Sequence, residues 1–131
     1  MLFGIHWYLV VLGALAYFAV GALWYSPVLF SKMWAKELGK GMPEKSDAAT
    51  AMATTLLAML VLVTVEAYFI HATGTSTAWR GAYLGAKIWL GFIATTALIN
   101  NVFQQASKKL YVIDQGYHLV GLVLAGLILA L

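Results

Sequence analysis

The sequence contains no cysteine, and only 10% of its 131 residues are charged. The absence of cysteine excludes disulfide bonds, zinc sites built on thiolates and cysteine nucleophiles. Soluble globular domains are about 25% charged and about 45–50% apolar, whereas 63% of this chain is hydrophobic. A soluble domain of this length could not bury so much apolar surface. The composition therefore predicts that lipid covers part of it.

Motifs of the familiar catalytic and nucleotide-binding classes are also missing. The sequence has no nucleophile elbow, phosphate loop or dinucleotide fingerprint. It has no basic run that would suggest nucleic acid, and we interpret its net charge of +3 as a membrane-orientation signal. His6, His71 and His118 could be axial haem ligands, but they are scattered and no dense histidine pair suggests a metal. We therefore expect no cofactor and no metal, and an enzyme is disfavoured.

Four apolar stretches are long enough to span a bilayer, which takes about 20 residues. They cover about 5–25, 48–71, 77–103 and 110–131. Within lipid only helices and closed barrels satisfy the backbone, and the alternating pattern of barrel strands is missing. The first stretch follows no Lys or Arg and exceeds a signal-peptide core, so we expect it to remain as a membrane helix. The sequence predicts one all-α domain, residues 1–131, with four transmembrane helices.

The first connection is the longest and has a helical pattern of its own. Ser26 and Pro27 suit the start of a helix. Apolar residues then recur at helical spacing while charged ones lie largely off that stripe, which predicts an amphipathic helix at 27–38 in the membrane interface. The connections at 72–76 and about 104–109 are short, so consecutive helices should form two antiparallel hairpins.

Lysine and arginine in the loops predict the orientation, because cytoplasmic loops carry an excess of both. The first and third connections hold Lys32, Lys36, Lys40, Lys45, Lys108 and Lys109. The opposite side has only Arg80, with Lys87 deeper in its helix. We expect the connections at 26–47 and 104–109 to be cytoplasmic and both termini to lie on the outer side of the membrane.

An outer polar group consists of His6, Glu66, His71 and Lys87. Glu66 lies about 9 Å inside the end of its helix, and Lys87 about 13–15 Å from the start of the next one. Because the loop between these helices is short, we predict an intramembrane ion pair between Glu66 and Lys87, or a water-linked equivalent. The pair could simply neutralise two buried charges, or it could relay protons or substrate.

A second polar group lies toward the predicted cytoplasmic side. Its candidate binding residues are Trp24, Tyr25, Ser26, Asn100, Asn101, Asp114, Tyr117 and His118. Asp114 and His118 are one helical turn apart and can interact directly. A carboxylate that orients a histidine suits proton transfer, ligand binding or metal ligation. The alternative is a hydrogen-bonded polar patch where the last helix meets the interface.

Small residues form stripes on several predicted helices. Gly13, Tyr17 and Gly21 share a face of the first helix, and Gly81 and Gly85 form a Gly-x-x-x-Gly pair on the third. Such stripes allow helices to approach closely. The Gly81–Gly85 pair could serve an internal contact or an oligomer contact.

Three segments resemble one known family. The segment 24–27 (WYSP), followed by Leu29-Phe30 and Trp34, resembles the first signature of the family called domain of unknown function 1761. The segments 113–119 (IDQGYHL) and 126–129 are similar to its second signature, and 89–92 with 95–98 to its third helix. The resemblance implies a small four-helix protein of the bacterial cytoplasmic membrane, and its signatures fall on the second polar group. It implies no activity, substrate or cofactor.

The sequence leaves three functions open. A transport or channel component would need a water-accessible path, most simply at an oligomer axis. An accessory subunit, or a protein that binds a lipid or quinone, would pack against a larger membrane complex. A membrane-embedded acid–base enzyme using Asp114 and His118 is the least favoured, because no nucleophile or metal set accompanies them. Expected partners are the bilayer and further copies of the chain or a larger complex, with no nucleic acid.

Overall fold

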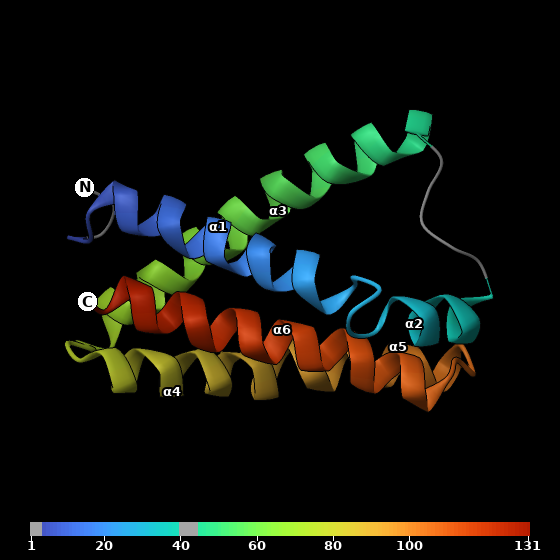
Figure 1. Cartoon of the computed structure of the whole chain (residues 1–131). Helices are drawn as coiled ribbons and strands as arrows, with labels where there is room; N and C mark the ends of the chain where they lie inside the picture. Colours follow the sequence, from blue (N-terminus) through green and yellow to red (C-terminus); the bar gives the residue numbers. More distant parts are fainter. Residues whose placement is uncertain (1–3, 40–44) are drawn as a thin grey trace.

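The computed structural model describes residues 4–39 and 45–131 (Figure 1). Its helices are α1 (Trp7–Trp24), α2 (Ser31–Leu38), α3 (Lys45–Ala72), α4 (Ala78–Ile88), α5 (Thr95–Phe103) and α6 (Lys108–Leu129). A π-helical segment, η1 (Trp89–Ala94), joins α4 to α5 without a break. The described residues contain no strand, so the predicted all-α class is confirmed for them.

Four helices are long and apolar enough to cross a membrane, as the sequence predicts. They are Trp7–Trp24, Ala48–Ala72, Ala78–Phe103 and Lys108–Leu129. The last begins slightly earlier than expected because the Ser107 hydroxyl accepts a hydrogen bond from the backbone N–H of Leu110, 3.2 Å away. A serine in this position satisfies a backbone donor that the first helical turn leaves unpaired.

Helix α6 is the centre of the arrangement (Figure 1). It packs against α1 on one side, and the continuous α4–η1–α5 helix runs antiparallel to it on the other. Helix α3 lies away from the other helices in its first half, where residues 51–58 are all exposed, and crosses α1 obliquely in its second half. The two chain ends lie at one end of the molecule, and α2 lies at the other end beside the start of α6.

Glycines allow α4 and α6 to meet backbone to backbone. A Cβ added to Gly81 would collide with the carbonyl oxygen of Gly126, and one added to Gly85 with that of Leu122. Both α4 glycines are buried. The Gly-x-x-x-Gly pair therefore serves an internal helix contact, one of the two roles that the sequence left open.

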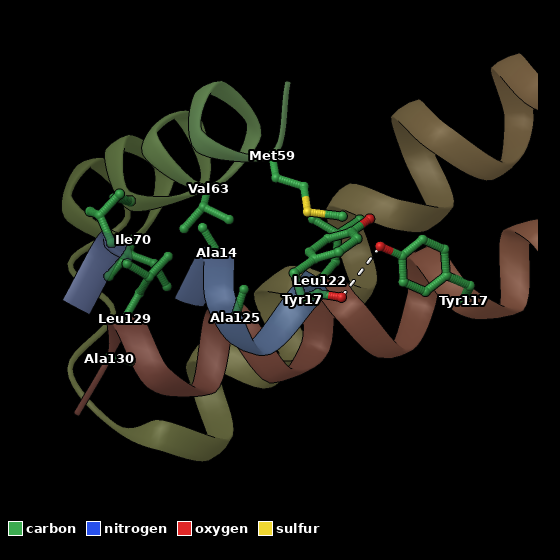
Figure 2. Close-up of a cluster of buried hydrophobic side chains, with 12 residues drawn as sticks. Ala14, Tyr17, Met59, Val63, Ile70, Tyr117, Leu122, Ala125, Leu129 and Ala130 are labelled. Atoms are coloured by element: carbon green, nitrogen blue, oxygen red, sulfur yellow. Dashed lines mark hydrogen bonds between the residues drawn. The ribbon is translucent and has the colours of Figure 1, made fainter. Parts of the chain in front are cut away.

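The buried core lies where α1, α3 and α6 meet (Figure 2). Tyr17 of α1, Val63 of α3 and Leu122 of α6 are almost completely buried. Gly121 makes room for the Tyr17 ring, since a Cβ there would lie 2.7 Å from ring atoms. The Tyr117 hydroxyl donates to the backbone carbonyl of Tyr17 at 3.3 Å, the bond drawn in Figure 2.

Helix α2 begins at Ser31, later than the predicted start at residue 27. The Ser26 hydroxyl donates to the carbonyl of Leu23 at 2.7 Å instead of capping a new helix. The Ser26 carbonyl accepts from the N–H groups of Leu29 and Ser31, which folds the segment between into turns. Gly39 ends α2 in the left-handed conformation, with φ 84°. Lys40, one of the lysines used to predict the orientation, lies outside the described residues.

The π-helical segment η1 interrupts a stretch that the sequence predicts as one regular helix. Side-chain hydroxyl groups donate hydrogen bonds to its backbone carbonyls. The Tyr111 hydroxyl donates to the carbonyl of Ala94 at 2.7 Å, and the Thr95 hydroxyl donates to the carbonyl of Gly91 at 2.9 Å. The indole N–H of Trp89 donates to the carbonyl of Gln115 on α6 at 2.8 Å. Short π-helical segments are frequent at functional sites, which directs attention to the surface beside η1.

Candidate functional site

Two adjacent aromatic residues at the end of α1 bind to α6. The Trp24 indole N–H donates to the carbonyl of Ile113 at 2.8 Å, and the Tyr25 hydroxyl donates to Asp114 Oδ1 at 2.6 Å. Gly116 leaves space for the Trp24 ring, 3.1 Å from where a Cβ would stand. Burial and the neighbouring Asp114 raise the pKa of Tyr25, so its phenol keeps the proton that it donates.

Asp114 and His118 take partners on α1 rather than each other. The Tyr17 hydroxyl lies 2.5 Å from His118 Nδ1, while Asp114 accepts from Tyr25. The Tyr117 ring contacts the Tyr17 and Tyr25 rings edge-on, at centroid distances of 5.3 and 5.5 Å. Tyr17 is therefore a member of this group that the sequence prediction did not include. Its signal was its spacing: Tyr17 and Tyr25 are eight residues apart, on one face of α1.

The remaining predicted residues of the second polar group do not join this cluster. Asn101 is buried in the α5–α6 turn, where it donates to the Ser107 carbonyl at 3.1 Å and accepts from Lys108 at 2.5 Å. Asn100 is exposed. Ser107 in turn donates to Glu37 of α2 at 2.6 Å. Five of the eight predicted residues therefore link α1 to α6, and with Tyr17 we call them the aromatic clamp: Trp24, Tyr25, Asp114, Tyr117 and His118. Asn100 and Asn101 lie near the α5–α6 turn instead, and Ser26 lies in the turn that follows α1.

The direct ion pair predicted between Glu66 and Lys87 is not formed, which corrects that expectation. Glu66 is 2% exposed, and neither of its carboxyl oxygens has a hydrogen-bond partner in the described structure. Lys87 is exposed, and its ammonium lies 4.4 Å from the centre of the Tyr83 ring. The reason is helical phase: Gly85 faces inward, and a residue two positions later points to nearly the opposite side of α4.

The glycine crossing of α4 and α6 accommodates the Glu66 carboxyl group. A Cβ added to Gly85 or to Gly126 would lie 2.9 Å from Glu66 Oε2. The carboxyl group of α3 therefore rests over the point where the two glycine-containing backbones meet. The sequence offered both signals, an intramembrane glutamate and a glycine stripe, but no pattern that joined them.

Glu66 also lines an apolar groove of about 360 Å³ on the side of the molecule. The groove lies between α3 and the α4–η1 helix, with α6 contributing one residue. Its lining residues are Leu62, Val65, Glu66, Phe69, Ile88, Phe92, Ile93 and Leu122. Glu66 is the one ionisable residue among them. Sequence reasoning missed this groove, because only the spatial arrangement brings η1 opposite α3.

A second cleft, of about 350 Å³, lies at the end of the molecule where the chain termini are found. His6 and His71 line it together with Thr75, Ser76, glycines and apolar residues. Among the described residues, no group of three or more His, Cys, Asp or Glu side chains is placed to hold a metal ion. Neither of the two clefts is lined by Trp24, Asp114 or His118.

The fold and site define a class: a small all-helical protein with four membrane-length helices and a buried carboxyl group beside a lateral groove. A family model described as "Protein of unknown function (DUF1761)" matches residues 8–130, nearly the whole chain. The chain therefore belongs to this family, as the resemblance of its end segments indicates. No curated protein and no solved structure matches it.

Proposed function

We propose that the protein is a small transport component of the membrane that takes up an apolar or amphipathic molecule in the groove at Glu66. The observation that carries the proposal is a buried carboxyl group without a hydrogen-bond partner, on a residue that lines an apolar groove. Leaving a buried polar group unpartnered costs about 1–3 kcal/mol. Ionisable residues within membranes commonly mark substrate or ion pathways.

The aromatic clamp is a poorer candidate for the ligand site. Its Trp24, Tyr25 and Asp114 side chains are engaged in hydrogen bonds between α1 and α6. A ligand would have to compete with these contacts. The Glu66 carboxyl group makes no hydrogen bond that a ligand would have to break, so we place the ligand in the Glu66 groove. The membrane-embedded acid–base enzyme loses its support for the same reason, since Asp114 and His118 face separate tyrosines.

The orientation belongs to this proposal. Helix α2 and the α5–α6 turn lie at one end of the molecule and both chain ends at the other (Figure 1), which is what two antiparallel hairpins require. The lysine distribution favours residues 26–47 and 104–109 on the cytoplasmic side of a bacterial membrane, with both termini outside. In this orientation α2 lies in the interface as the amphipathic helix that the sequence predicts.

We also propose that the protein self-associates. Residues 51–58 on the diverging half of α3 are all exposed, and α3 meets the other helices only in its second half. A second copy could cover this half of α3 and enclose the groove further. The alternative is that the protein is an accessory subunit of a larger complex, or binds a lipid or quinone without moving it.

Narrowing the groove should prevent binding. Val65 lines the groove at its rim, whereas Val61, one turn away on the same helix, does not line it. We expect Val65→Phe to weaken binding of a lipophilic probe at least about tenfold, or 1.4 kcal/mol, and Val61→Phe to leave it unchanged. The measurement is equilibrium binding of tetraphenylphosphonium and of decylubiquinone to the protein in lipid nanodiscs.

The outcomes separate the candidate functions. Binding of neither probe, or equal effects of the two substitutions, contradicts a ligand site in this groove. If a probe binds as expected, its movement across proteoliposomes supports the transport component. Binding without movement supports the alternative, a lipid-binding or quinone-binding accessory protein.

A further inference from the structure

We infer that the Glu66 groove selects lipophilic organic cations, molecules with an apolar body and one positive charge, and that it exchanges the cation for the proton of the carboxyl group. The inference rests on the proposed function, because it names the class of molecule that the same groove would take. Three features carry it: the missing positive partner of Glu66, the composition of the groove walls and the two aromatic rings in them.

The first feature is that nothing in the described structure neutralises an ionised Glu66. The neighbouring helix α4 has two basic residues: Arg80 lies over Trp79 and Lys87 over Tyr83, and neither lines the groove. From α1, the group within electrostatic range is the Tyr17 hydroxyl, which is engaged with His118 of α6. The segment η1 contributes no ionisable residue. A carboxylate here would be an unpaired charge in apolar surroundings, which is costly, and an entering cation removes that cost.

The second feature is the groove wall, which selects what accompanies the charge. Apart from Glu66, every lining residue is aliphatic or aromatic. A small hydrated ion would lose its water and find one carboxyl group in exchange. A cation with a large apolar body instead buries that body against the walls, at roughly 25 cal/mol for each Å² removed from water. The groove therefore favours organic cations over inorganic ones.

The third feature is a pair of phenyl rings. Phe69 of α3 and Phe92 of η1 both line the groove. The faces of aromatic rings attract organic cations, and the attraction is strongest where water is excluded. A carboxylate with two aromatic walls is thus matched to an organic cation, whereas a neutral quinone would gain nothing from the charge of Glu66.

The exchange is balanced in atoms and charge. In the empty groove the carboxyl group carries its proton and is neutral. When a cation enters, the O–H bond breaks and the proton passes to water. The carboxylate and the cation then form a neutral pair, and no electron is transferred. No hydrogen bond holds the carboxyl group over Gly85 and Gly126, so only packing opposes its rotation toward the cation.

The experiment measures tetraphenylphosphonium binding and proton release together. With the protein in lipid nanodiscs and weak buffer, we expect one proton to be released for each cation bound. Because protons and cations compete for one carboxylate, the affinity should rise by about tenfold for each pH unit while the group is protonated. Glu66→Gln should abolish both effects. Glu37→Gln, which removes a carboxyl group on α2, should change neither.

Decylubiquinone, measured in parallel, distinguishes this inference from the proposed function. If the quinone binds and Val65→Phe blocks it while the phosphonium does not bind, the groove is a ligand site but not a cation site. Phosphonium binding without proton release, or undiminished in Glu66→Gln, overturns the exchange. Because the pH series uses the unaltered protein, it remains decisive even if Glu66→Gln fails to fold.

Discussion

Replacing Gly81 with alanine is expected to destabilise the fold by at least about 1–3 kcal/mol, the usual cost of overfilling a packed site. The added methyl group would collide with the backbone carbonyl oxygen of Gly126, and it would also lie 2.7 Å from Ala130 Cβ. Backbone cannot move aside like a flexible side chain, so α4 must shift away from α6. The loss should appear as a lower free energy of unfolding in a denaturant titration of the protein in mixed micelles.

The matched control is Gly91→Ala on the same continuous helix. A Cβ at Gly91 would meet no atom within 4 Å, and alanine is the better helix former. We therefore expect Gly91→Ala to leave the stability unchanged or slightly raised. Equal effects of the two substitutions would show that α4 and α6 are not in contact at Gly81. They would also contradict the placement of the Glu66 carboxyl group at the crossing of these two helices.

Replacing Glu66 with methionine is expected to stabilise the protein by about 1–3 kcal/mol while abolishing phosphonium binding. Methionine has the same unbranched shape and length, and it leaves no polar atom unpartnered among apolar neighbours. Most substitutions of buried residues destabilise, so a gain would mark Glu66 as a residue kept for function at the expense of stability. The measurement is the same denaturant titration, with phosphonium binding followed on the same preparation.

The control for this substitution is Glu66→Gln, which keeps the shape and a polar head. It should bind no phosphonium but show little gain in stability, since its amide remains unpartnered. A clear loss of stability in Glu66→Met would contradict the account, because it would mean that the carboxyl group holds the helices together.

The membrane helices were predictable because each rests on a local property. Twenty apolar residues in a row fix a span wherever the rest of the chain lies. The Ser107 cap, which was not predicted, and the end of α2 at Gly39 are also set by local residues. The start of α2 was not predicted correctly, because the Ser26 hydroxyl donates to the Leu23 carbonyl in the last turn of α1 and does not cap α2.

The candidate site depended on relations that a single sequence does not contain. The pairing of Glu66 with Lys87 was argued from depth alone, and depth says nothing of the side of α4 on which Lys87 points. The grouping of Asp114 with His118 used one helix, whereas their partners Tyr25 and Tyr17 come from another. The π-helical segment follows from backbone register, which hydropathy does not record.

The most direct test of the Glu66 groove is modification by dicyclohexylcarbodiimide, an apolar reagent that adds to protonated carboxyl groups. Membranes containing the protein would be treated with and without tetraphenylphosphonium, and the modified residue located by mass spectrometry. Our account predicts that Glu66 is modified, that the phosphonium slows the reaction, and that Asp114, held by Tyr25, reacts far less. An unmodified Glu66, or a reaction that the phosphonium leaves unchanged, would contradict it.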